Sequence, residues 1–284
     1  MTAAALSEWV AGHEPWLRGA CFAAMLVAMA LWEVAAPRRG LTLARRRRWP
    51  GNLGVVVLNT VLLRLVFPTA AVGMAAVAAA GGFGLLNVVP LPFAATTLIA
   101  ILVLDAAIYL QHAMFHAIPL LWRLHRMHHA DLDFDTTTGL RFHPLEILLS
   151  MGLKIAIVAA LGPPVAAVVL FEILLNATSL FSHGNVRLGE RLDRALRWIV
   201  VTPDMHRVHH SIRVHETNSN FGFNLPWWDR LLGTYRAQPE DGHETMTIGI
   251  EDFRDSGDLR LDRMLVQPLA GAAGSYPINQ RRRD

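Results

Sequence analysis

The sequence predicts an all-α integral membrane protein with about four to five membrane helices and a cytosolic, histidine-rich helical cap. Of its 284 residues, 53% are hydrophobic and 17% are charged, whereas soluble domains carry about 25% charged residues. The apolar residues gather in runs long enough to cross a bilayer. Most of the 13 histidines lie close to the ends of these runs, which places a polar site at the membrane boundary.

The apolar runs predict the membrane helices in chain order. A proline interrupts the second run, and Gly162-Pro163-Pro164 separates the last two. This Gly-Pro-Pro sequence is a strong turn signal, so the last two runs form a Pro-linked helical hairpin. The runs cover residues 17–36, 53–80, 93–111, 145–162 and 165–182.

The arginines predict the orientation of these helices. A basic cluster follows the first run, at 38–39 and 45–48, and a second one lies at 281–283. Basic clusters beside membrane helices mark the cytoplasmic side and contact anionic lipid. With the first cluster inside, the runs alternate so that 93–111 and 165–182 both end at the cytoplasmic face. No nucleic-acid-binding signature accompanies the arginines, so nucleic acid is excluded as a partner.

Three regions follow from this organisation. Residues 1–92 hold the N-terminal membrane helices and the basic loop. Residues 93–236 hold the histidine motifs, and residues 237–284 form a polar C-terminal tail. Within the second region, the turn-rich aromatic segment 218–235 is expected to pack as a wall or lid under the histidines.

The pattern His-x-x-His-His occurs twice, at 125–129 and at 206–210. Positions i, i+3 and i+4 share one helix face, so each pattern is expected to direct three imidazoles at one point. His112 and His116 lie one helical turn apart at the end of a membrane helix. Imidazole is the commonest metal-ligand side chain, and these eight suffice for two metal ions. They are His112, His116, His125, His128, His129, His206, His209 and His210.

His143 and His183 lie at the entry and exit of the hairpin, at the same predicted height. Both are expected as ligands, with a capping or hydrogen-bonding role as the alternative. They raise the ligand set to ten, about five for each metal, with one position left for oxygen or water. His13 and His243 are expected at the surface, and His215 near the site.

The residue types narrow the chemistry of the site. The single cysteine, Cys21, excludes a Cys-ligated zinc site and a multi-cysteine iron–sulfur cluster. Ten histidines exceed the four ligands of a closed zinc site, and the H-E-x-x-H metalloprotease pattern is absent. A pair of oxygen-activating irons fits best, although imidazole ligation also suits copper.

Acidic and phenolic side chains near the histidines are candidates to orient them, because metal-bound imidazoles usually donate their second N–H to an oxygen. Asp105 lies two turns before His112, in an apolar run where an acid is costly. Asp204 is a similar candidate, with a helix cap as the alternative. The full set is Asp105, Tyr109, Asp204, Glu146 and Glu172.

These motifs resemble those of the fatty acid hydroxylase/sterol desaturase superfamily of membrane di-iron enzymes. The resemblance covers about residues 95–236 and looks closest to the sterol desaturase branch. It rests on Asp105…Tyr109…His112…His116, on residues 125–129, on His143-Pro144-Leu145-Glu146, on His183, on residues 202–210, on Asn220-Phe221-Gly222 and on residues 228–234.

The resemblance implies two Fe ions, with O2 as co-substrate, and an enzyme that hydroxylates or desaturates C–H bonds of a lipid. Sterols, acyl chains, alkylglycerols and carotenoids are the implied substrate types. Electrons are expected from a separate cytochrome b5- or ferredoxin-type reductase system. We expect a bacterial inner-membrane location with the active site facing the cytoplasm. The alternative is a non-catalytic membrane metal- or haem-binding protein or transporter.

Overall fold

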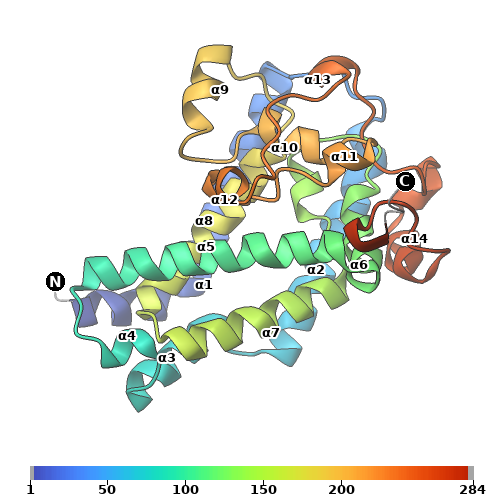
Figure 1. Cartoon of the computed structure of the whole chain (residues 1–284). Coiled ribbons are helices and arrows are strands. Elements are labelled where there is room, and N and C mark those ends of the chain that lie inside the picture. The colour runs from blue at the N-terminus through green and yellow to red at the C-terminus, as the bar shows by residue number, and fades with distance from the viewer. Residues whose placement is uncertain (1–2, 281–284) are drawn as a thin grey trace.

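The chain is all-helical over residues 3–280, the part that the computed structural model describes (Figure 1). This confirms the predicted fold class. Arg281 to Arg283, the predicted second basic cluster, lie outside the described residues. The longer helices are α1 (Ala3–Ala35), α2 (Arg45–Val66), α3 (Ala70–Gly81), α5 (Phe93–Ala117), α6 (Pro119–His129), α7 (Pro144–Leu161) and α8 (Val165–Ser182).

Shorter helices complete the cap around the ends of α5, α6 and α8. They are α9 (Glu190–Leu196), α10 (Pro203–His209), α11 (Val214–Thr217), α12 (Trp227–Leu231), α13 (Gly242–Thr245) and α14 (Leu261–Val266). One further short helix, α4 (Leu85–Val88), precedes α5, and 3-10 turns lie at η1 (Thr136–Leu140), η2 (Ser256–Leu259), η3 (Gln267–Leu269) and η4 (Ile278–Gln280).

Five segments of the described chain are long and apolar enough to cross a membrane, as predicted. The second is broken at Pro68, where α2 ends at Val66 and α3 begins at Ala70, because proline cannot continue the helical hydrogen bonds. The segments are Ala5–Ala35, Arg45–Val88, Phe93–Ala117, Pro144–Leu161 and Val165–Ser182.

The predicted hairpin is formed by α7 and α8, and Gly162 makes its turn. Gly162 adopts φ +62°, and a Cβ there would lie 2.7 Å from the Phe83 carbonyl oxygen. Only glycine accepts both the left-handed backbone and this close approach. The turn therefore packs directly on the segment that leads into α4.

The first helix extends further toward the N-terminus than predicted. α1 begins at Ala3, whereas the apolar run begins at 17. Glu14 and Arg18 form an i,i+4 ion pair on α1, and such pairs support helix in a polar stretch. Apolar periodicity alone therefore placed the start of the helix too late.

The basic cluster at 45–48 was predicted to contact lipid headgroups, but one of its arginines is buried inside the protein. Arg46 and Arg47 are exposed, but Arg48 is fully buried and pairs with Asp131 at 2.7 Å and with Asp135 at 2.6 Å. Burial alone would raise the pKa of Asp131, but the charge and hydrogen bonds of Arg48 hold that pKa below its usual range. The polar segment after α6 is thus clamped onto α2.

The C-terminal tail is packed against the histidine region over its described part. Tyr276 stacks on Trp122 of α6, with ring centroids 5.4 Å apart. Arg126, also on α6, donates hydrogen bonds to the carbonyls of Gln267, Ala270 and Ala272. Residues that the sequence placed in a polar tail therefore form one wall of the histidine site.

Candidate metal centre

The histidines lie on or directly after four helices, α5, α6, α8 and α10. α6 begins with Pro119 and α10 with Pro203, each at a first helical position, where the fixed φ of proline is favourable. Thr202 caps α10 by accepting a hydrogen bond from the Met205 N–H. His112 and His116 occupy the last turns of α5, and His183 follows the last residue of α8.

Nine histidines form two groups, in each of which the candidate ligand nitrogens lie within 4.8 Å of one another. All nine are buried, none more than 4% exposed. The five-histidine group is His112, His116, His125, His129 and His209. The four-histidine group is His128, His183, His206 and His210.

Each His-x-x-His-His pattern was expected to direct its three imidazoles at one point, and this expectation was wrong. Each is shared between both groups: His125 and His129 belong to one group, whereas His128 belongs to the other. Adjacent helix positions differ by about 100° around the axis, so i+3 and i+4 point to opposite sides of i. The second pattern divides at the same positions, but with the groups exchanged. His206 and His210 belong to the four-histidine group, and His209 belongs to the five-histidine group.

The imidazole nitrogens are spaced as ligands of shared metal ions would be. Nε2 of His112 and Nε2 of His125 are 3.1 Å apart. Nε2 of His183 lies 3.2 Å from Nε2 of His128 and 3.0 Å from that of His206. Two nitrogens bound about 2.1 Å from a metal at right angles lie about 3 Å apart.

Several buried ring nitrogens have no hydrogen-bond partner, and this too fits a metal centre. Buried polar atoms are normally paired, and an unpaired one costs about 1–3 kcal/mol. Neither ring nitrogen of His129 or of His210 has a hydrogen-bond partner among the described residues. The other unpartnered nitrogens among the nine clustered histidines are Nε2 of His116 and His209, and Nδ1 of His128 and His206.

The histidines outside the membrane-spanning segments are held in the neutral form that metal ligation requires. Burial lowers the pKa of His183 to about 4. Burial, followed by the nearby imidazoles, holds the pKa values of a further set well below the usual range: His128, His129, His206, His209 and His210. Neutral imidazoles present lone pairs at neutral pH.

Backbone carbonyls orient three of the rings through their second nitrogens. Nδ1 of His112 lies 2.8 Å from the Phe221 carbonyl, and Nδ1 of His209 lies 2.7 Å from the Ser219 carbonyl. Nδ1 of His183 bonds the Ser179 carbonyl of α8. The expected wall at 218–235 is therefore present, and its backbone fixes ring orientation, a role that no side-chain pattern signals.

A carboxylate orients His125. Glu146, in the first turn of α7, lies 2.7 Å from its Nδ1. Glu146 was among the acidic residues predicted to orient a histidine ring, and this contact agrees with that prediction.

His143 lies outside both groups. It precedes α7, where its Nδ1 accepts a hydrogen bond from the Leu145 N–H, and its Nε2 lies 3.2 Å from the Leu265 carbonyl. Both ring nitrogens are therefore engaged with the backbone. We assign His143 to capping in place of the expected ligation, because its neighbours already satisfy the atoms that a metal would need.

The remaining predicted acidic and phenolic residues do not contact the nine histidines. Asp105 accepts hydrogen bonds from Trp228 Nε1 at 2.8 Å and from the Leu225 N–H. The Tyr109 hydroxyl lies 2.8 Å from Thr234 Oγ1. Both residues therefore hold α5 against segment 218–235, whose backbone carbonyls orient the histidines. They affect the site only through that segment.

Asp204 also supports the site indirectly. It forms ion pairs with Arg207 and, at 3.1 Å, with Arg38, which tie α10 to the basic loop. His243 lies beside it and is 5% exposed, whereas a surface position was expected. Burial lowers the pKa of His243 to about 3. His13 and His215 are not in either group; His215 pairs with Glu240 and lies with Glu216 and Glu240 in a separate cluster that is partly exposed.

Replacing Glu146 with glutamine tests the orienting contact. We expect about 10- to 100-fold weaker metal affinity, since removing such a partner usually has that effect. The measurement is metal retained after dialysis against a graded chelator. Glu251→Gln, on the exposed tail, is the control, and equal retention in both variants would contradict the assignment.

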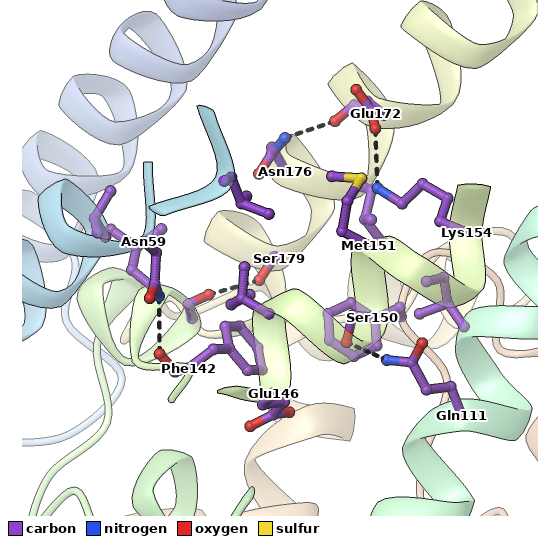
Figure 2. A pocket seen from close by; sticks show the side chains of 18 of the residues that line it. Asn59, Gln111, Phe142, Glu146, Ser150, Met151, Lys154, Glu172, Asn176 and Ser179 are labelled. Atoms are coloured by element: carbon purple, nitrogen blue, oxygen red, sulfur yellow. Dashed lines mark hydrogen bonds and ion pairs between the residues drawn. The ribbon is translucent and has the colours of Figure 1, made fainter. Parts of the chain in front are cut away.

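A cavity of about 250 Å³ opens beside the five-histidine group and runs between the membrane helices. His112 and His125 line one end. Apolar side chains and several polar ones form its walls (Figure 2). A chain-like molecule could therefore lie between α2, α5, α7 and α8 with one segment next to the histidines.

Comparison with known proteins agrees with this site. The model of the fatty acid hydroxylase family matches residues 97–234. An ornithine lipid hydroxylase, OlsE, of Rhizobium tropici is 30% identical over 181 residues, which cover 63% of this chain and 52% of that protein. The human alkylglycerol monooxygenase is 31% identical over 154 residues, which cover 54% and 34%.

A cholesterol 25-hydroxylase of Rattus norvegicus is 26% identical over 57% of this chain and 53% of its own. The chain thus spans about half the length of two of these relatives and about a third of the human protein. No solved structure matches the chain. Residues 97–234, which contain all nine clustered histidines, thus match the fatty acid hydroxylase family.

Proposed function

We propose that the protein is a membrane di-iron oxygenase that hydroxylates a lipid with O2 and externally supplied electrons. The observation that carries this proposal is the pair of buried histidine groups with unpartnered nitrogens, adjoining a cavity between membrane helices. The relatives are named as hydroxylases and a monooxygenase of lipids. Their names favour hydroxylation over desaturation.

The two groups would each hold one iron, through five imidazoles in one group and four in the other. When bound, the iron pair supplies the oxygen activation that amino-acid side chains cannot perform. Iron is preferred to zinc because the five imidazoles of one group exceed the four ligands of a closed zinc site. The residues of the chain supply ligation, ring orientation and exclusion of water.

The cavity would position the lipid. Phe115 and Ile108 of α5 and Met151 of α7 line it together with His112. These apolar walls favour a hydrocarbon segment, because burying apolar surface contributes about 25 cal/mol per Å². A substrate that enters sideways from the bilayer would present its chain to the histidines without crossing water.

The orientation is proposed from the basic loop. Arg48 pairs with Asp131 and Asp135, just after the His-x-x-His-His pattern at 125–129, and Arg46 and Arg47 are exposed nearby. The histidines and the arginines therefore share one end of the helices. By the positive-inside rule this end faces the cytoplasm, as a bacterial inner-membrane enzyme served by a separate cytochrome b5- or ferredoxin-type electron donor would require.

The first test is elemental analysis and absorption spectroscopy of the purified protein, followed by oxygen uptake with a reductant and membrane lipids. We expect about two irons per chain, no haem band, and lipid-dependent oxygen uptake that yields an alcohol. Stoichiometric haem would instead favour the haem-protein alternative. Metal transport without any lipid oxidation would favour the transporter.

Removing the metal is expected to destabilise the folded protein. The paired nitrogens at 3.0–3.2 Å and the unpartnered ones would again lack ligands, and a bound metal contributes binding energy only to the folded state. We expect chelation to lower Tm by several degrees or more. Re-addition of Fe(II) under argon should restore Tm, and an unchanged Tm after verified metal loss would contradict the proposal.

A further inference from the structure

A cluster of charged side chains lies between the membrane helices. Lys154 Nζ is 3.0 Å from Glu172 Oε1, and Arg18 Nη1 is 3.0 Å from Glu172 Oε2. Arg18 also pairs with Glu14 on α1. Lys154 lies ten residues after the start of α7, and Glu172 ten residues before the end of α8, so both lie near the middle of the hairpin helices. Figure 2 shows the contact between these two side chains.

Charged groups at this depth are costly and usually mark a functional site. Three of the four, Arg18, Lys154 and Glu172, line the same cavity that reaches His112 and His125. The cluster and the candidate metal centre therefore border one continuous space. The apolar walls already described lie between them.

The cluster carries donors that lack a partner. Both carboxylate oxygens of Glu172 are engaged by cations. The buried Nε of Arg18 has no hydrogen-bond partner, and a lysine ammonium carries three donors, of which one contact, to Glu172, is made here. Glu172 Oε2 has an ion-pair contact but no hydrogen bond, so it does not satisfy these donors. An oxygen acceptor from a ligand would satisfy them.

The spacing of residues along α7 gives the distance between the charged cluster and the histidine end of the cavity. Glu146, Ser150 and Lys154 follow one another at i, i+4 and i+8 and all line the cavity. Glu146 contacts His125. At 1.5 Å per residue, eight residues place Lys154 about 12 Å along the helix from the glutamate that orients a candidate ligand.

We propose that Lys154 and Arg18, held by Glu172, bind the carboxylate or ester carbonyl oxygen of a chain lipid at the end of the cavity remote from the histidines. This contact would fix the position along the chain that lies beside His112 and His125. The proposal rests on the proposed function and adds to it a substrate class: lipids whose oxidised carbon lies about 12 Å from a carbonyl or carboxylate group.

A purely structural role makes a different prediction. The ion pairs also join α1, α7 and α8, so they could act only as a clamp. A clamp affects all bound lipids equally and acts through stability. A binding subsite instead discriminates between a lipid with a carbonyl oxygen and a hydrocarbon of the same length.

The experiment measures displacement of the fluorescent fatty acid cis-parinaric acid from the full-length holoprotein under argon, where no turnover occurs. The competitors are oleic acid, methyl oleate and 8-heptadecene. The variants are Lys154→Met and Lys154→Arg. Arg64→Met removes an exposed positive charge from α2, outside the cavity, and is the matched control.

We expect oleic acid or methyl oleate to compete at least about tenfold better than heptadecene in the wild type, the effect of one hydrogen bond to a charged group. Lys154→Met should lose this preference, whereas Lys154→Arg and Arg64→Met should keep it. A stronger effect of oleic acid than of its ester identifies a carboxylate ligand, and equal effects identify a carbonyl.

Heptadecene competing as well as oleic acid in the wild type would overturn the proposal. So would an unchanged preference in folded Lys154→Met. If that variant does not fold, Lys154→Met/Glu172→Leu removes the ion pair together and is read in the same way. Binding is measured without turnover, so failure of the proposed hydroxylation, seen as absent oxygen uptake, is distinguished from failure of the subsite.

Discussion

Replacing His209 with alanine is expected to release the metal of the five-histidine group and abolish lipid oxidation while the protein remains in the membrane. His209 Nε2 has no partner among the described residues, and its Nδ1 is held by the Ser219 carbonyl. Its loss removes a ligand and leaves the helices intact, since α10 packs through other residues. The measurements are iron per chain, oxygen uptake and the fraction recovered in washed membranes.

The neighbouring His210 provides an internal comparison, because it belongs to the other group. His210→Ala should deplete the second metal, so each single variant should fall from about two metal ions per chain toward about one. His215→Ala, an exposed histidine paired with Glu240, is the control and should keep both. Full metal content and activity in His209→Ala would rule out the proposed centre.

Replacing Arg48 with methionine is expected to destabilise the fold more than any surface change. Its guanidinium is fully buried against Asp131 and Asp135. Breaking a buried ion pair from one side costs about 3–5 kcal/mol, because the remaining charge is left uncompensated. We expect a large fall in the free energy of unfolding in detergent, with loss of metal because Asp131 follows the His-x-x-His-His pattern at 125–129.

Arg47→Met is the matched control, because Arg47 is exposed one position earlier in the same helix. Its effect should stay within about 0.5 kcal/mol. The double variant Arg48→Met/Asp131→Asn should recover part of the lost stability, since it removes a buried charge together with its partner. Equal stability of Arg47→Met and Arg48→Met would show that the ion pairs do not support the fold.

The fold class was predictable because the pattern that carries it is local. Twenty-residue apolar runs and the turn at Gly162 act within one or two helices, so periodicity and turn chemistry were sufficient. The start of α1 was missed because the pair of Glu14 and Arg18 supports helix where hydropathy is low. The network around Arg48 was missed because burial of a charge depends on partners distant in sequence.

The two histidine groups were predictable to a similar degree and for a similar reason. A repeated His-x-x-His-His motif is rare enough to identify the residues, and nine of the ten expected ligands lie in the two groups. His143 has the same residue type at the right height, but its backbone contacts engage both nitrogens. Sequence cannot distinguish a capping imidazole from a ligating one.

The sequence by itself determined the membrane helices, the histidines that gather at one end of them, and hence the class of chemistry. Only the tertiary structure decided how the histidines divide, because helix rotation sends His128 away from His129 and joins each to a histidine from another helix. It also decided what lines the cavity. Lys154, Glu172 and Arg18 meet through side-chain contacts between three helices, and contacts of that kind leave no periodic pattern in the chain.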